Sequence, residues 1–155
     1  MSKEKSSARD WKKIYPKVAF VKAGKEDEGY MLRLAAKEIG IVPQRLRSHT
    51  NLLIHLGGQR IGFISYRRLP DNIIYIYLFV LEEQCQNRGY AQPVILKLIM
   101  MEREKQPLEG INFRIHKTNQ QALHVALEKY GYKVIKEMPK HLVLFKPYPP
   151  DYKPV

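Results

Sequence analysis

The residues best suited to chemistry in this sequence lie in one short turn. Its members are Gln86, Asn87, Arg88, Gly89, Tyr90 and Ala91. A glycine and a small residue stand where larger side chains would keep a ligand away from the backbone, and Gln86 and Arg88 add hydrogen-bond donors. If the turn leads into a helix, the first amides of that helix have no intrahelical acceptor and the helix dipole favours an anion. The pattern indicates a phosphate-binding turn, although turns of this kind also serve structure alone.

The segments on either side of the turn have the patterns of a buried strand and an amphipathic helix. Residues 72–81 are continuously apolar and rich in β-branched and aromatic side chains, which is typical of a strand buried on both faces. After the turn, Pro93 suits a first helical turn. An apolar stripe at helical spacing follows, formed by Val94, Ile95, Leu98 and Ile99. The sequence therefore predicts strand, turn and helix in succession.

The remaining segments predict the elements that must support this turn. Strands are expected at 17–22, 51–56, 60–66, 111–116, 132–136 and 141–146, and helices at 31–39 and 118–130. Gly57 and Gly58 favour a tight hairpin, and the spacing of Thr118 and Gln121 is that of a capping box at a helix start. The order is β-α-β-β-β-α-β-α-β-β, which predicts the α/β class with a mixed sheet and helices packed against it.

Length and composition predict one domain. A chain of 155 residues with 45% hydrophobic residues can build one core. Residues 1–16 are polar and mostly basic, so we expect a flexible basic arm there, in which Trp11 and Tyr15 dock locally. The domain is expected over 17–147, and a tail rich in proline and tyrosine over 148–155.

Other features limit the compartment and the class of site. The longest apolar segment, 72–81, is far shorter than the roughly 20 residues of a membrane span. The lone Cys85 excludes an intramolecular disulfide and a cysteine-based zinc site, and the histidines have no metal-ligand spacing, so we expect no metal. These features favour a cytoplasmic protein with no membrane association.

The formal net charge of +12 is the strongest compositional signal. A basic surface attracts phosphate-rich partners, so nucleic acid or a ribonucleoprotein is a candidate partner. From Pro43 to Pro70 there is no acidic residue before Asp71, and the arginines there are Arg45, Arg47, Arg60, Arg67 and Arg68. The alternative is that these charges are solvated and serve solubility.

The strand order and two motifs resemble those of the Gcn5-related N-acetyltransferase (GNAT) family. The acetyl-coenzyme A loop of that family has the form Gln/Arg-x-x-Gly-x-Gly/Ala after the fourth strand, which Gln86, Gly89 and Ala91 match. A second signature is an asparagine at the start of a helix that closes with Gly-Phe or Gly-Tyr. Asn119 and the pair at 131–132 resemble it.

The resemblance covers residues 17–147 and implies a GNAT-like fold with acetyl-CoA as acyl donor. It implies that an amine attacks the thioester directly while backbone amides at the end of the fourth strand polarise the carbonyl. The expected cofactor-binding residues are the loop from Gln86 to Ala91 together with Phe79, Leu81 and Asn119. The family often forms dimers, so the resemblance is also compatible with a homodimer.

The catalytic residues that the resemblance implies depart from the family pattern. The strand carries no carboxylate, so Glu82 and Glu83 just after it are the candidate bases, with solvated loop charges as the alternative. Leu127 stands where many members have a tyrosine that protonates the leaving thiolate. Tyr130, one turn later, is a candidate acid or a core aromatic. His116 ends a strand. It is a candidate base or a candidate contact to the acceptor, and the alternative is a histidine bonded to backbone.

Two functions from different classes follow. The first is an N-acetyltransferase that acts on an amine of a protein or of a nucleic-acid-associated acceptor. The alternative is a catalytically weak or inactive module of the same fold that binds nucleic acid or a protein partner through its basic surface. The missing strand carboxylate and the leucine at position 127 favour the alternative.

Overall fold

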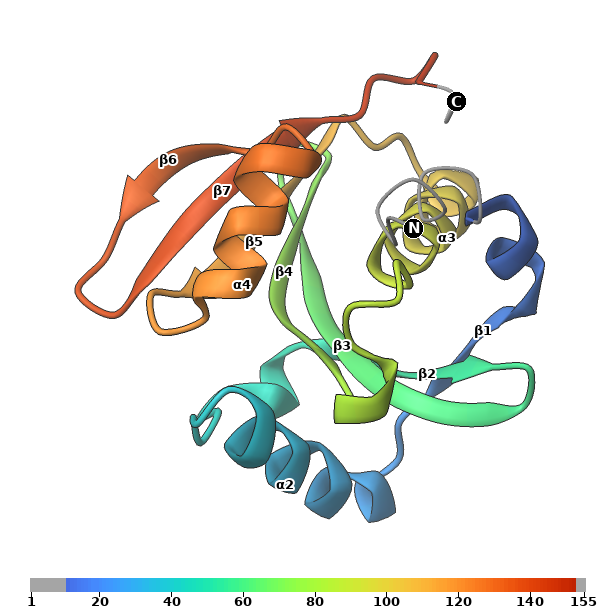
Figure 1. Ribbon diagram of the computed structural model, residues 1–155. Helices are drawn as coiled ribbons and strands as arrows, with labels where there is room; N and C mark the ends of the chain where they lie inside the picture. Colours follow the sequence, from blue (N-terminus) through green and yellow to red (C-terminus); the bar gives the residue numbers. More distant parts are fainter. Residues whose placement is uncertain (1–10, 153–155) are drawn as a thin grey trace, which may run out of the picture.

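The computed structural model describes residues 11–152, and within them one mixed sheet carries the fold (Figure 1). Its strands are β1 (Val18–Lys22), β2 (Thr50–Leu56), β3 (Gln59–Leu69), β4 (Ile73–Leu81), β5 (Gly110–His116), β6 (Lys133–Glu137) and β7 (His141–Pro147). They lie in the order β1-β2-β3-β4-β5-β7-β6. In the part of the chain that the structure describes, β4 and β5 are the one parallel pair. The predicted fold class and element order are confirmed.

Within the described residues, and apart from the helical turn at 11–14, three α-helices cover the two faces of this sheet. They are α2 (Glu28–Glu38), α3 (Ala91–Lys105) and α4 (Gln120–His124). Side chains of α3 and α4, such as Leu98 and Leu123, share one apolar cluster with Ile76 of β4. The α2 residue Leu34 shares a second cluster with Val80. The sheet thus separates α2 from α3, as Figure 1 shows, and each face has its own core.

A β-bulge in β4 changes which side chains face which helix. The register shifts at Ser65 and Tyr66, whose partners are Leu78 and Ile76, so Tyr77 has no partner on β3. Before the bulge Ile76 faces the α3 core, and after it Leu78 faces the α2 core. A bulge of this kind bends the strand and re-aims its side chains. Tyr77 therefore lies at the point where β4 changes direction.

Strands β4 and β5 are paired over only part of their length. Their parallel ladder runs from Ile73 opposite Gly110 to Ile76 opposite Phe113 and goes no further. The last four residues of β4 keep their partners on β3 but have no β5 partner, and Tyr77 pairs with neither strand. Backbone groups on that edge are therefore left for another acceptor or donor. We call the place where the two strands part the β4–β5 opening.

Two local predictions differ in outcome. Leu56 pairs with Gln59 around Gly57 and Gly58, whose φ angles are 58° and 83°, so the tight hairpin is confirmed. The helix predicted from residue 118 begins instead at Gln120, and it continues as a π-helix over Val125–Lys129. The N-cap is Asn119, whose side-chain oxygen accepts a hydrogen bond from Ala122 N–H at 3.3 Å. The predicted capping box is wrong because this asparagine provides the cap.

Packed residues extend beyond the range 17–147. Trp11 is buried in the α3-side core and meets Tyr15 edge to face at 6.2 Å. Tyr148 is buried in the same core, and Arg103 of α3 donates to its carbonyl at 2.8 Å. Both chain ends are thus packed onto the domain as far as they are described. The first ten residues of the predicted arm lie outside the described residues.

Candidate functional site

The predicted turn begins directly beyond the end of β4. The Gln86 side-chain amide donates to the carbonyl of Leu81 at 2.9 Å and to the Glu38 carboxylate of α2 at 2.7 Å. Asn87 and Gly89 have left-handed φ angles of 62° and 76°, which turn the chain back toward α3. Gln86 therefore fixes the loop to the strand end and to α2, and its amide group is engaged within the protein.

The start of α3 leaves its backbone amides available. Tyr90 is the N-cap residue but gives no side-chain cap, and the first turn contains no acidic residue. The first backbone bond of the helix runs from Val94 N–H to the Tyr90 carbonyl at 3.2 Å. Arg88 lies in the same loop, held by a 2.7 Å bond from its Nε to the Gln84 carbonyl. Uncapped amides, a helix dipole and a guanidinium together favour an anion.

Aromatic rings line the β4–β5 opening on the α3 side. Phe79 and Phe113 face each other from the two strands with ring centroids 6.2 Å apart. On the adjacent helix α4, the Gln121 side chain donates to Asn87 Oδ1 of the loop. Asn119 serves as the helix cap, so the structure gives its side chain a structural role. Gln121 is a loop contact that no sequence motif indicated.

A cavity of about 240 Å³ lies against the opposite face of the same opening. Its lining consists of Ile41, Val42, Pro43, Gln44, Arg45, Tyr77, Arg114 and His116. These come from the segment after α2, from the bulge of β4 and from the end of β5, where the strands have parted. The lining includes two arginines and no carboxylate. We call this space the basic cavity.

Contacts among ring and guanidinium groups hold the floor of the basic cavity in place. His49 stacks on Tyr77 with centroids 4.4 Å apart and planes at 11°. The Arg114 guanidinium carbon lies 4.1 Å from the same ring centroid, and one of its terminal nitrogens is 3.2 Å from His116 Nε2. Arginine has only donors, so His116 Nε2 is the acceptor. The imidazole is therefore neutral in this arrangement, with its proton on Nδ1.

The three histidines in and around the cavity all have lowered pKa values. Burial, followed by the charge of Arg114, lowers the pKa of His116 below its usual value. Burial and the charge of Arg114 also lower the pKa of His141, whose ring centroid is 6.0 Å from that of His116. Burial lowers the pKa of His49. All three imidazoles are therefore biased toward the neutral form near pH 7.

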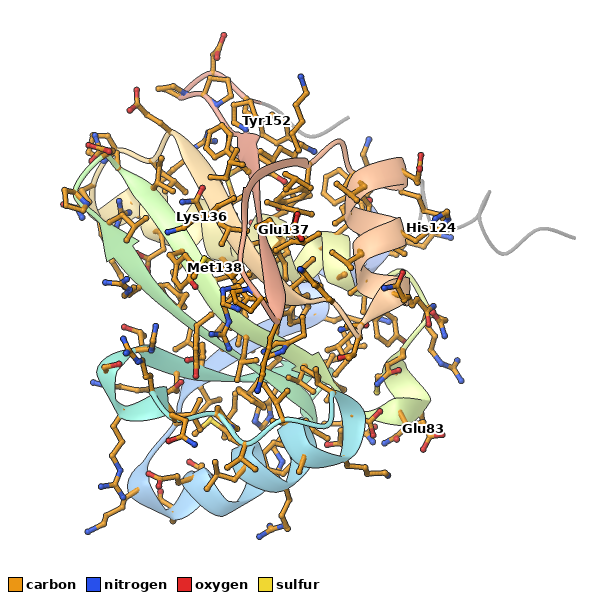
Figure 2. All side chains as sticks on the ribbon, turned by 90° about the vertical axis from the view of Figure 1, so that its left-hand side faces the viewer. Glu83, His124, Lys136, Glu137, Met138 and Tyr152 are labelled. Atoms are coloured by element: carbon orange, nitrogen blue, oxygen red, sulfur yellow. The ribbon has the colours of Figure 1, made fainter. Side chains whose placement is uncertain are left out.

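The predicted carboxylate candidates lie away from the cavity lining. Glu82 accepts a hydrogen bond from Tyr30 of α2 at 2.7 Å and another from Gln84 at 3.0 Å. Glu83 forms a 3.7 Å ion pair with Lys37, and its side chain is 74% exposed. Figure 2 shows Glu83 at the periphery of the molecule. Glu82 is fixed between loop and helix, whereas Glu83 is a solvated surface charge.

Tyr130 and Cys85 are surrounded by groups that suit a core role. Burial raises the pKa of the Tyr130 hydroxyl, which lies close enough to Tyr132 and Tyr148 to contribute to their raised pKa values. Leu127, in the π-helix, is partly exposed. Cys85 is buried, and burial raises the pKa of its thiol, so a thiolate is disfavoured there.

The arginines that the sequence grouped together divide in the structure. Arg47 pairs with Glu28 at 3.0 Å, Arg60 lies over the Tyr30 ring, and Arg68 pairs with the buried Glu102 at 3.2 Å. Arg45 lines the basic cavity. Arg67 lies 5.4 Å from the ring of Tyr75 on β4. Only part of the predicted basic cluster therefore contributes to one site.

Residues 11–152 contain neither a cluster of metal-ligating side chains nor a helix suited to a membrane. No group of three or more histidine, cysteine, aspartate or glutamate side chains there could hold a metal ion. None of the helices in that range is long and apolar enough to cross a membrane.

Comparison with known proteins agrees with the fold described above. A family model described as the acetyltransferase (GNAT) family matches residues 10–132. No curated protein sequence matches the chain. Similar solved structures include Ard1 from Thermoplasma volcanium, with a TM-score of 0.68 and 14% identity over 84% of this chain and 97% of that one.

Two further structures have the same fold. The PaiA N-acetyltransferase from Thermoplasma acidophilum, in complex with coenzyme A, has a TM-score of 0.65 and 16% identity, covering 84% of this chain and 99% of that one. An acetyltransferase from Thermus thermophilus has a TM-score of 0.65 and 13% identity over 86% of this chain and 99% of that one. At these identities the likeness shows the fold.

Proposed function

Because the chain belongs to the acetyltransferase (GNAT) family, whose acyl donor is acetyl-CoA, we propose that it transfers an acetyl group to an amine bound in the basic cavity. One observation supports this most: two different sites meet at the β4–β5 opening. The phosphate-binding loop follows the end of β4, and the basic cavity lies against the parted strands on the α2 face. The donor and the acceptor can therefore reach one point from opposite faces.

The donor side fits a long molecule with a diphosphate at one end. The uncapped amides at the start of α3 and the Arg88 guanidinium would hold the diphosphate. Phe79 and Phe113 would bound the pantetheine arm where it enters the opening. The unpaired edge of β4 from residue 77 to 81 would supply amides to the thioester carbonyl. Apart from the Arg88 guanidinium, these roles belong to backbone or apolar groups.

The chemistry is direct aminolysis. The lone pair of the acceptor nitrogen forms a C–N bond with the acetyl carbon, the C–S bond breaks, and coenzyme A leaves as the thiolate. A proton must then leave the nitrogen. Among the residues predicted as catalytic, His116 is the one that lines the cavity, and its environment keeps it neutral, the form that accepts that proton once Arg114 releases Nε2. Glu82 is engaged by Tyr30 and Gln84.

A module that binds nucleic acid through its basic surface remains the second candidate. The net charge of +12 supports it. The pairing of Arg47 with Glu28 and of Arg68 with Glu102 weakens it, because those arginines already have carboxylate partners. The exposed lysines would then have to provide most of the phosphate contacts.

The test is calorimetric titration with acetyl-CoA, followed by mass-spectrometric detection of acetylated products from a panel of amines. Gly89→Trp places a large side chain at a left-handed position in the loop, so we expect it to abolish donor binding. Gly57→Trp is the matched control, since Gly57 is also left-handed but lies in the β2–β3 hairpin with open space around it. Wild-type protein that binds no acetyl-CoA would overturn the proposal.

A further inference from the structure

We infer that the acceptor carries an oxyanion, a carboxylate or a phosphate, close to its reactive amine, and that Arg114 binds this group in the basic cavity. The inference rests on the proposed function and names the substrate class for the same site. The cavity contains Arg45 and Arg114, and its lining has no carboxylate to neutralise them. A purely cationic acceptor such as a polyamine would enter against this charge.

Arg114, unlike Arg47 and Arg68, has no acidic partner among the described residues. Arg68 forms an ion pair with Glu102 and donates to the backbone carbonyls of Glu102, Gln106 and Pro107. Within residues 11–152, Arg114 is found in no ion pair, and its Nε is a buried donor without a hydrogen-bond partner. A buried donor left unsatisfied is costly unless a ligand provides the acceptor.

The Arg114 guanidinium is also held in a defined orientation. It lies over the Tyr77 ring at 4.1 Å, and His49 stacks on that ring at 4.4 Å. His49 is held in turn by a 2.6 Å hydrogen bond between its Nδ1 and the Arg45 carbonyl. A planar guanidinium that is already oriented loses little entropy when it binds an oxyanion through two parallel hydrogen bonds. The arrangement therefore suits a carboxylate or a phosphate better than a neutral amide.

Size limits the group that enters the cavity. At about 240 Å³ the space is slightly smaller than the common range of ligand pockets, roughly 300 to 1,000 Å³. It accommodates a group of amino-acid size. A larger acceptor would insert only its amine-bearing end, with the oxyanion a few bonds from the nitrogen.

Binding of an oxyanion would also affect the proton acceptor. In the structure Arg114 donates to His116 Nε2, which occupies the only lone pair of the neutral imidazole. An oxyanion that takes over this guanidinium releases Nε2 to accept the proton from the amine. The oxyanion is thus expected to increase kcat as well as to lower KM.

The experiment compares matched amines on the full-length protein. The probes are the L-amino acids, their carboxamides, 2-aminoethylphosphonate and spermidine, each assayed for acetylation with acetyl-CoA at saturation and, separately, for calorimetric binding to the protein. The carboxylate and phosphonate arms distinguish the two sources of oxyanion. We expect kcat/KM for the best anionic amine to exceed that of its neutral counterpart by about ten- to a hundredfold.

Two variants assign the preference to one residue. Arg114→Gln should reduce the ratio between anionic and neutral amines to near one, in binding and in turnover. Arg47→Gln removes the same charge from the neighbouring segment outside the cavity and should keep the ratio, because Arg47 is exposed and pairs with Glu28. Both variants should bind acetyl-CoA as tightly as the wild type, which shows that they are folded.

The outcomes separate this inference from the proposed function. If no amine is acetylated, the proposed function fails, and the calorimetric preference for anionic amines still decides the inference. Equal binding of carboxylate and carboxamide probes, a preference for spermidine, or an unchanged ratio in Arg114→Gln would each overturn it.

Discussion

The two sides of the β4–β5 opening are built in different ways. The donor loop, Gln86 to Ala91, consists of consecutive residues that contribute mostly backbone groups. Asn87 and Gly89 are left-handed, and the start of α3 is uncapped. The basic cavity consists of side chains from distant segments, with Arg45 after α2, Tyr77 on β4 and Arg114 on β5. In our proposal the first binds a diphosphate through backbone amides, whereas the second selects a particular group on the acceptor.

This difference indicates how the two sites tolerate change. A backbone site keeps its chemistry while most side chains vary, provided that the turn keeps its glycine. A side-chain site can change its substrate through one substitution, since one arginine supplies most of its selectivity. The comparison holds only if variants on one side leave the other side intact, and that can be tested.

The largest effect is expected for His116→Gln. Loss of the proton acceptor should lower kcat/KM by about 10² to 10⁴, because general-base catalysis contributes that much, while acetyl-CoA binding stays unchanged. The acidic limb of the pH profile provides the second measurement. Burial and Arg114 lower the pKa of His116, so the active neutral form is lost only as the pH falls below the usual histidine value of about 6.5.

The control is His141→Gln, which removes a neighbouring imidazole from β7 that shares the lowered pKa. It should keep the rate and an acidic limb, which shifts slightly to higher pH because the charge of His141 no longer lowers the pKa of His116. His116 is flanked by Arg114, His141 and Lys140, whose charges all act to lower its pKa. An acidic limb that persists in His116→Gln would assign the proton acceptor to another group. The acceptor side would then no longer differ from the donor side by carrying His116 as the proton acceptor.

The sequence predicted the strand, turn and helix of the donor side well because their signals are contiguous. An apolar strand, a turn with Gly89 and a helix with Pro93 in its first turn follow one another in the chain, and each has a local physical signature. The order of the elements along the chain followed from the same reading. The helix start at Gln120 was missed by two residues because Asn119 competes with Thr118 for the cap, and propensity alone does not decide between adjacent cap residues.

Less of the acceptor side could be predicted in this way, although His116 and Arg45 of the cavity lining were named from the sequence. Tyr77 lines the cavity because of a β-bulge opposite Ser65 and Tyr66, and neither serine nor tyrosine is a sequence signal for a bulge. Arg114 was not singled out, because an arginine in an alternating strand normally points into solvent. The arginines chosen for their proximity in sequence were divided by tertiary contacts, as the Arg68–Glu102 ion pair shows.

A smaller effect is expected at the contact between the donor loop and α4. Gln121→Ala removes the hydrogen bond to Asn87, which supports a left-handed residue of the loop. One hydrogen bond of this kind contributes about 0.5 to 1.5 kcal/mol, so acetyl-CoA should bind roughly two- to tenfold more weakly in a calorimetric titration. Gln120→Ala is the control, since Gln120 bonds to the backbone of Lys117 instead. A changed acceptor KM in Gln121→Ala would mean that the two sides are coupled.

The smallest effect is expected for Tyr130→Phe, which tests whether this tyrosine protonates the leaving thiolate. The Tyr130 hydroxyl contributes to the raised pKa values of Tyr132 and Tyr148. Tyr148 follows Pro147, which pairs with Gly110 at the start of β5. The strands part only after Phe113, toward the other end of β5. We therefore expect kcat to change by less than about twofold, since an acid in contact with the sulfur would contribute about 10² or more. A large loss of kcat together with loss of a basic limb in the pH profile would place Tyr130 at the reacting thioester.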